Sequence, residues 1–283
     1  TFFIFYVLVI FLSNIYHEKF DNGFFLYAIT SVSMSYILIS KNISSKAILL
    51  PLWILVAYFL FLMITGINPN FALGDSSSSR NGISVILINI TVLSILIDYK
   101  NKKIPSLALP LFVFLICVWT LSRAGILCSF IVLYSSFHLR FKSKNTVSEK
   151  FKFFLKSVLA LSIPILLNLR FLIKEITPLI EASVGRGFSF ASDERADFLN
   201  FYIDNMDMNY LLFGMYLKGS GLFSANSNAH NSFIQLHSLT GIFGLLTIFL
   251  IIYLLLKTLK KNFAIGLLSI ALILRGFTDT IYF

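Results

Sequence analysis

The sequence predicts an all-α integral membrane protein of about nine transmembrane helices. Of its 283 residues, 57% are hydrophobic and 13% are charged, and the mean hydropathy is +0.85. A soluble domain carries about twice that charged fraction. The 31 phenylalanines would leave a soluble fold with more apolar surface than it can bury. Long apolar stretches separated by short lysine clusters therefore indicate a single polytopic membrane domain over residues 1–283.

Each transmembrane helix needs about 20 apolar residues. Nine stretches meet or approach this length: 1–16, 24–40, 47–67, 81–98, 104–121, 124–139, 153–173, 231–256 and 262–280. The first stretch lacks a basic start and a small-residue cleavage site, so it is predicted as a membrane helix and not a signal peptide. The chain starts without Met and stops just after an apolar stretch. We therefore expect a fragment of a longer protein, with helices missing at either end.

The fifth and sixth helices are predicted from one nearly unbroken apolar run over 104–139. A single helix of that length would extend about 54 Å, well beyond a hydrocarbon core of about 30 Å. The lysines and arginine at 100–103 and 140–144 flank the run, so both of its ends should lie on the same side. The run is therefore expected to fold into a hairpin that turns at its central polar group, Ser122-Arg123-Ala124-Gly125.

Charge asymmetry between alternate loops predicts the orientation. The loops assigned to the cytoplasm hold two acids, Asp98 and Glu149, and 13 of the 23 basic residues. These are Lys41, Lys46, Lys100, Lys102, Lys103, Arg140, Lys142, Lys144, Lys150, Lys152, Lys257, Lys260 and Lys261. The opposite side collects the other 11 acids. The positive-inside rule then places the segment 174–230 outside the cytoplasm as one large loop.

Several classes of site and partner are excluded. The net charge of +10 lies in short clusters between apolar runs, without the aromatic interleaving of a nucleic-acid surface, so no nucleic acid is expected. Cys117 and Cys128 lie in apolar runs and are predicted to be core residues. No His, Cys or acidic cluster has metal-ligand spacing, and no phosphate-binding glycine motif is present, so neither metal nor cofactor is predicted.

The loop 174–230 is the one extended polar segment. Its residues Ser192 and Asp193 predict a helix start, because serine caps helices and acids favour the positive end of the helix dipole. Leu199, Tyr202 and Ile203 then form a short apolar stripe. The nearby acids could hold a metal or act as a base, but a solvated helix start is the more common role of such residues.

Four arginines are predicted at or near the membrane on the outer side: Arg80, Arg123, Arg195 and Arg275. An arginine at membrane depth is costly unless it is paired or hydrated, which makes it a functional candidate. A structural role, with pairing to Asp279 or Asp75, stays open. Guanidinium groups bind phosphate in a bidentate manner, so a cluster facing outward suits a lipid-linked phosphate or pyrophosphate.

Two histidines lie near the end of the loop. His230 precedes the eighth apolar stretch, where an imidazole can act as a general base near neutral pH, and a helix-capping role is the alternative. His237 lies seven residues further on, too distant in the helix to share a metal with His230. It is expected to contribute through packing.

Residues 80–283 contain several short motifs in a particular order. These motifs are Leu121-Ser122-Arg123-Ala124-Gly125, Leu212-Phe213-Gly214 with Gly219 and Gly221, Ala229-His230-Asn231-Ser232-Phe233, Leu239-Thr240-Gly241-Ile242-Phe243-Gly244, and Arg275-Gly276-Phe277. The loop arginine in Glu194-Arg195 belongs to the same set. In these motifs and their order, the chain resembles the O-antigen polymerase and O-antigen ligase superfamily.

The resemblance implies a metal-independent membrane glycosyltransferase of the C-type fold. Its donor would be an undecaprenyl-pyrophosphate-linked glycan, and its active face would lie on the periplasmic side of the bacterial inner membrane. Arg195 and Arg123 would hold the donor pyrophosphate and stabilise the leaving group, and His230 would deprotonate the acceptor hydroxyl. Further substrate-binding residues would be Arg80, Arg186, Asn231 and Arg275. Membrane lipid and a protein that regulates chain length are the expected additional partners.

Three functions stay open at this point. A polymerase would transfer the growing glycan onto a lipid-linked repeat unit, and the short chain and modest loop favour it. A ligase would transfer the same donor to lipid A core. A transporter of lipid-linked glycans would need charges buried within helices and paired broken helices, whereas here the charges gather at one face.

Overall fold

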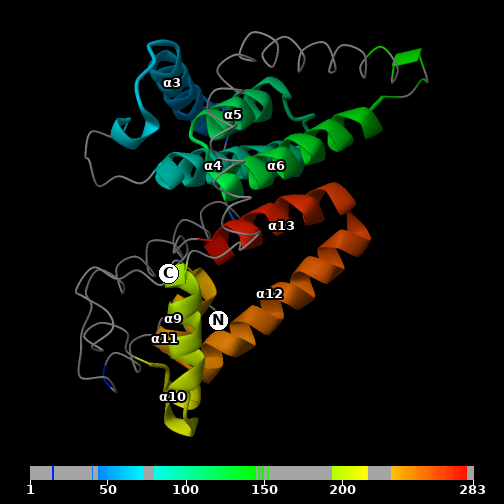
Figure 1. Ribbon diagram of the computed structural model, residues 1–283. Helices are drawn as coiled ribbons and strands as arrows, with labels where there is room; N and C mark the ends of the chain where they lie inside the picture. Colours follow the sequence, from blue (N-terminus) through cyan, green and yellow to red (C-terminus); the bar gives the residue numbers. More distant parts are fainter. Residues whose placement is uncertain are drawn as a thin grey trace.

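The computed structural model describes residues 44–72, 80–144, 193–215 and 231–278, with a few isolated residues between these ranges (Figure 1). Every α-helix in this part of the chain has residue bounds close to an apolar or amphipathic stretch of the sequence. The helices are α3 (Ser45–Ile64), α4 (Arg80–Lys100), α5 (Ala108–Trp119), α6 (Arg123–Lys142), α9 (Asp193–Asp204), α10 (Met208–Phe213), α11 (Ser232–Thr240), α12 (Ile242–Lys261) and α13 (Phe263–Thr278). A short 3-10 helix, η1, covers Pro69–Phe71. No strand occurs within the described ranges.

Four of these helices, α3, α4, α6 and α12, are long and apolar enough to cross a membrane. Their lengths of 19 or 20 residues give about 30 Å of helix, which matches the hydrocarbon core. Large apolar side chains on α12, such as Leu246, Phe249 and Tyr253, are exposed. An exposed apolar face of this extent would be unfavourable in water and is typical of contact with lipid. The described helices thus indicate a membrane protein.

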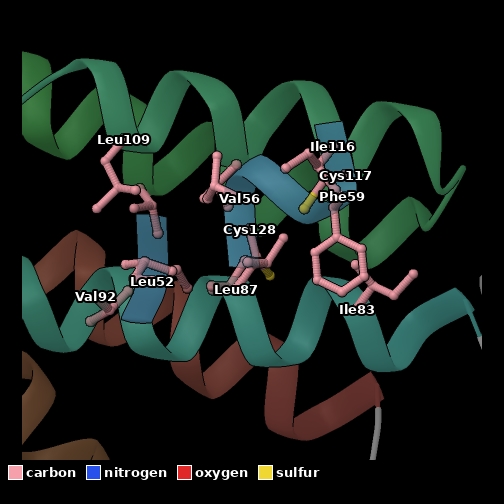
Figure 2. Close-up of a cluster of buried hydrophobic side chains, with 14 of the residues drawn as sticks. Leu52, Val56, Phe59, Ile83, Leu87, Val92, Leu109, Ile116, Cys117 and Cys128 are labelled. Atoms are coloured by element: carbon pink, nitrogen blue, oxygen red, sulfur yellow. The ribbon is translucent and has the colours of Figure 1, made fainter. Parts of the chain in front are cut away.

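The main core joins α3, α4, α5, α6 and α13 (Figure 2). Val56 and Phe59 of α3 and Leu87 of α4 are completely or almost completely buried there, as Figure 2 shows. The thiols of Cys117 and Cys128 belong to the same cluster and form no disulfide. Their placement agrees with the prediction that both cysteines are core residues. Burial of each large side chain contributes about 1.5–3 kcal/mol in such a cluster.

The C-terminal ends of α4 and α6 lie next to the connection between α12 and α13. The amide of Asn262, between α12 and α13, donates to the Tyr99 hydroxyl near the end of α4 over 2.8 Å. The His138 ring near the end of α6 packs against the Phe263 ring at the start of α13, with centroids 6.0 Å apart. The last turns of α4, α6 and α12, all of which carry lysine, therefore meet at one end of the helix group, here called the basic end.

The opposite end of α4, α6 and α13, here called the polar end, is held by hydrogen bonds between side chains. The Ser122 hydroxyl before α6 donates to the Asn81 side chain at the start of α4 over 2.8 Å. Arg275 in the last turn of α13 donates to the Asn81 carbonyl over 2.9 Å. Helices α4 and α6 are thus parallel, and α13 is antiparallel to both. Gathering of the lysines at one end is the arrangement that the positive-inside pattern requires.

The prediction of one helix over 231–256 is wrong, because the chain breaks at Gly241 into α11 and α12. Gly241 has φ +55°, a conformation that interrupts helical geometry and is readily adopted by glycine. A β-carbon at Gly241 would also overlap the carbonyl group of Leu212, in α10. The break is therefore made where another segment crosses the chain, which hydropathy does not reveal.

The predicted hairpin turn is confirmed, but the bounds of both helices differ from the prediction by a few residues. Helix α5 ends at Trp119 and α6 begins at Arg123, after a turn in which Leu121 has φ +52°. However, α5 begins at Ala108 and not at 104, so it covers only about 18 Å. Three predicted helices, 1–16, 24–40 and 153–173, and most of the loop 174–230 lie outside the described residues.

Side-specific labelling of cysteines will test the orientation. In a Cys117→Ala, Cys128→Ala background, we expect Lys142→Cys and Lys260→Cys to be shielded from a membrane-impermeant maleimide in intact cells. Both lysines are exposed and lie at the basic end. Asn226→Cys should react without disruption of the inner membrane. Labelling at position 260 in intact cells, with none at 226, would reverse the orientation.

Candidate active site at the polar end

Ser122 connects the hairpin turn to α4. Its hydroxyl accepts a hydrogen bond from the Gly125 amide over 3.2 Å, which caps the start of α6. The same hydroxyl lies 2.8 Å from the Asn81 side-chain oxygen and 3.2 Å from the Ser84 hydroxyl. Because a carbonyl oxygen can only accept, Ser122 donates to Asn81. Ser122 thus holds the start of α6, where Arg123 lies, against the start of α4.

Arg275 completes this network from α13. Only 1% of its surface is exposed, and its Nη2 donates to the Asn81 carbonyl and, over 3.1 Å, to the Ser84 hydroxyl. Its Nη1 donates to the Thr278 hydroxyl over 3.0 Å. These bonds hold the guanidinium group against the helix ends, where it is inaccessible to a ligand. The prediction that Arg275 binds substrate is therefore revised, since its contacts give it a positioning role.

Gly125 allows α6 to approach α4 at this point. A β-carbon at position 125 would lie 2.7 Å from the Ser84 β-carbon and 2.8 Å from the Ser122 hydroxyl. Both distances are shorter than ordinary contacts. A side chain at this position would therefore push apart the groups that form the network.

The structure brings some of the predicted site residues to one end of the molecule. Arg123 is the first residue of α6, is exposed, and directly follows the buried Ser122. Arg80 is the first residue of α4, next to Asn81. The helix starts that carry these two arginines therefore meet at the polar end. Arg195 belongs to the first turn of α9.

Asn231, predicted from the sequence to bind substrate, caps a helix in the structure. Its side-chain oxygen accepts hydrogen bonds from the amides of Phe233 and Ile234, over 2.9 and 3.2 Å, and caps α11. The Phe233 ring packs on the Phe277 ring of α13 with centroids 4.4 Å apart, two residues beyond Arg275. The start of α11 is thereby attached to the polar end. His230 and Arg186 lie outside the described residues.

A second buried polar contact, between Tyr202 and His237, has no counterpart in the sequence-based predictions. The Tyr202 hydroxyl of α9 is hydrogen-bonded to Nδ1 of His237 in α11. The other ring nitrogen, Nε2, lies 3.3 Å from the Leu211 carbonyl oxygen of α10. Since that carbonyl can only accept, Nε2 carries a proton. Burial lowers the pKa of His237 and so favours the neutral imidazole, in which Nδ1 accepts from the Tyr202 hydroxyl.

The sequence contained little evidence for this pair. Its partners lie 35 residues apart, and Tyr202 was one of three residues in a predicted apolar stripe. Of the three, Tyr202 is buried, whereas Leu199 and Ile203 are exposed. The predicted stripe did not specify which of its residues are buried. A polar hydroxyl at the buried position was the sole sequence feature that pointed to a specific contact.

Metal ligands are not grouped in the described ranges, since no set of three or more His, Cys, Asp or Glu side chains there lies close enough to hold an ion. The chemistry that the polar end supports is electrostatic. It offers guanidinium groups at helix starts, where backbone amides and the helix dipole favour anions.

A comparison of Arg275→Lys with Arg123→Lys separates positioning from binding. Arg275→Lys should lower the free energy of unfolding by about 1–3 kcal/mol, because one ammonium cannot replace the guanidinium donors and leaves buried acceptors unsatisfied. Arg123→Lys, at an exposed position, should change it by less than about 0.5 kcal/mol. Thermal unfolding of the purified protein in detergent measures both. Equal stability of wild type and Arg275→Lys would contradict the role given to the network.

The burial of His237 predicts a dependence on pH. Burial lowers the pKa of His237 below its ordinary value of 6.5, and the hydrogen bond to Leu211 opposes this shift only in part. The unfolded chain therefore takes up the proton more readily, so stability is complete above about pH 6.5 and declines as the pH falls. The decline should be smaller in His237→Gln, which keeps every carboxylate of α9 and α10. Identical pH curves for the two proteins would rule out this contribution.

Comparisons of the chain with models of known protein families, with characterised proteins and with solved structures find no match. The resemblance to O-antigen polymerases and ligases therefore stays a prediction from the sequence motifs.

Proposed function

We propose that the chain is an O-antigen polymerase, or a polymerase of a related surface polysaccharide, in the bacterial inner membrane. It would transfer a growing glycan from undecaprenyl pyrophosphate onto a lipid-linked repeat unit at the periplasmic face. The observation that carries the proposal is the meeting of the α4 and α6 starts at the polar end, with Arg123 exposed beside the buried Ser122 network.

This arrangement suits a lipid-linked pyrophosphate. The starts of α4 and α6, which carry Arg80 and Arg123, lie at the end of the helix group opposite the lysine clusters. The charge pattern predicts that this end lies at the outer face of the inner membrane. Guanidinium groups bind phosphate oxygens in pairs, and preorganised charge stabilises a leaving group without the need for a metal. A donor whose polyprenyl chain stays in the bilayer would present its pyrophosphate at this depth.

The proposed reaction is a single displacement or an equivalent two-stage transfer at the anomeric carbon of the donor. The bond from that carbon to the pyrophosphate oxygen breaks, and a bond to the acceptor hydroxyl oxygen forms. The hydroxyl proton passes to neutral His230, and undecaprenyl pyrophosphate leaves with its charge stabilised by Arg123 and Arg195. Arg275 takes no part in binding and supports the start of α6 that carries Arg123.

Transfer to lipid A core, the ligase reaction, would use the same donor and the same residues. The acceptor alone distinguishes the two enzymes. We favour the polymerase because the predicted loop over 174–230 is modest in size. The charge distribution also argues against a lipid-glycan transporter, because the candidate arginines lie at helix ends and not within helices that span the membrane.

An assay in vitro tests the proposal directly. Purified protein in lipid nanodiscs is supplied with an undecaprenyl-pyrophosphate-linked repeat unit, and the products are resolved as a glycan ladder. Wild-type protein should lengthen the glycan without added metal and in the presence of a chelator. Arg123→Ala and His230→Ala should each reduce the rate about 10²–10⁴-fold, the usual range for loss of a general base or a charge-stabilising donor.

Donor binding separates the two roles. His230→Ala should bind the donor nearly as well as wild type, whereas Arg123→Ala and Arg195→Lys should bind it more weakly. Lys142→Ala, at the basic end, is the control and should extend the glycan normally. Extension of lipid A core in place of the repeat unit would make the protein a ligase. A full-length ladder from His230→Ala at matched concentration would remove the base from this mechanism.

A further inference from the structure

The buried pair Tyr202–His237 joins three short helices outside the membrane-spanning helices. The tyrosine belongs to α9, the histidine to α11, and the carbonyl that accepts from the imidazole to α10. Only 5% of Tyr202 and 4% of His237 is exposed. Each ring nitrogen thus has a partner from a different helix, and neither group faces solvent. Such contacts hold elements together more specifically than apolar packing, because each donor fits one acceptor.

Two glycines make the close packing around this pair possible. Gly214, which ends α10 with φ +86°, approaches the carbonyl groups of His237 and Ser238 so closely that a β-carbon would overlap them. Gly241 approaches Leu212 in the same way from the end of α11. Met215 is buried beside Tyr202, with Ile234 of α11 packed against them. The backbones at the ends of α10 and α11 therefore contact each other directly beside the Tyr202–His237 pair.

The position of the pair connects the two halves of the candidate site. Along α9, Arg195 precedes Tyr202 by seven residues, which is two helical turns or about 10 Å. Along α11, His237 follows the capping residue Asn231, and α11 rests on α13 through Phe233 and Phe277. Helix α13 in turn holds the start of α6. The placement of α9 relative to the polar end thus depends on the contact between Tyr202 and His237.

We propose that Tyr202 and His237 are positioning residues, which fix α9 on α11 and so hold Arg195 at the site that contains Arg123. Neither side chain would touch substrate. The role of Arg195 in this statement rests on the proposed function, whereas the fixing of α9 does not. Loss of the Tyr202 hydroxyl would leave Nδ1 of His237 without its donor and would loosen α9 without removing any group from the reaction.

Hydrogen exchange tests the fixing of α9 in the full-length protein in nanodiscs. In Tyr202→Phe the amides of residues 201–204 should exchange about 10-fold faster than in wild type, because the free energy of local opening falls. Tyr210→Phe is the matched control, since Tyr210 lies on α10 with an exposed ring and no part in the pair. Unchanged exchange in Tyr202→Phe overturns the proposal, whatever the activity of the protein.

A double-mutant cycle tests the connection to Arg195. Tyr202→Phe should reduce kcat/KM for glycan extension about 10-fold, mainly through a higher KM for the lipid-linked donor, while Tyr210→Phe leaves it within about 2-fold. In an Arg195→Lys background the same change should cost less than about 2-fold, because residues that act through one another are not additive. Equal losses in both backgrounds would show that the pair acts on the fold alone and would overturn the positioning of Arg195.

The two proposals fail in different ways. Wild-type protein that extends no lipid-linked glycan would refute the proposed function, yet exchange in Tyr202→Phe would still decide whether the pair fixes α9. Conversely, active wild-type protein with unchanged exchange in Tyr202→Phe would refute the positioning role and leave the proposed function standing.

Discussion

The buried guanidinium group of Arg275 is the interaction on which the candidate site depends. It comes from α13 and reaches the start of α4, where Asn81 and Ser84 accept hydrogen bonds from it. Asn81 and Ser84 in turn contact Ser122, which begins α6. A charge in an apolar helix group is costly unless its donors are satisfied. The Nη1 and Nη2 donors are bonded to groups of α13 and α4, and Ser122 links the start of α6 to the same groups of α4, so burial of the charge favours one arrangement of the three helices.

A consequence of this arrangement is a division of labour among the arginines. Arg275 is buried and contacts protein groups, whereas Arg123 is exposed at the first position of α6, next to Ser122 of the network. An arginine that stabilises charge in a reaction must be held in place yet accessible, and neighbouring residues provide these two properties. The small size of Gly125 contributes to this arrangement, because a larger residue would separate α6 from α4 where the network forms. The wider site depends in a similar way on α11, whose start is capped by Asn231 and packed on α13.

Polar contacts supplement apolar packing in the described helix group. Large apolar residues of α12 and α3 are exposed, as is typical of contact with lipid, whereas Val56 and Phe59 of α3 are buried in the core. Polar contacts at the two ends add partners that apolar packing does not specify, through Asn262 and Tyr99 at the basic end and through Arg275 at the polar end. Between α9, α10 and α11, Tyr202 and His237 make such a contact, and glycines allow the backbones to approach. The fold is therefore specified both by the apolar core and by polar contacts near the helix ends.

The sequence by itself determined the all-helical character of the described ranges, the presence of apolar helices long enough to cross a membrane, the helices at 81–98 and 124–139 to within a few residues, and the hairpin turn at Ser122. These features could be predicted because hydropathy, charge and a local polar group are properties of short stretches of chain. They do not depend on which other helices pack nearby. Only the tertiary structure decided that 231–256 breaks at Gly241, that Arg275 faces Asn81 and Ser84, and that His237 bonds to Tyr202. Each of these depends on a partner distant in the chain: 191 residues separate Arg275 from Ser84, and 35 separate His237 from Tyr202. The identity of a single residue does not show which distant residue it contacts, because the contact forms only when the helices pack.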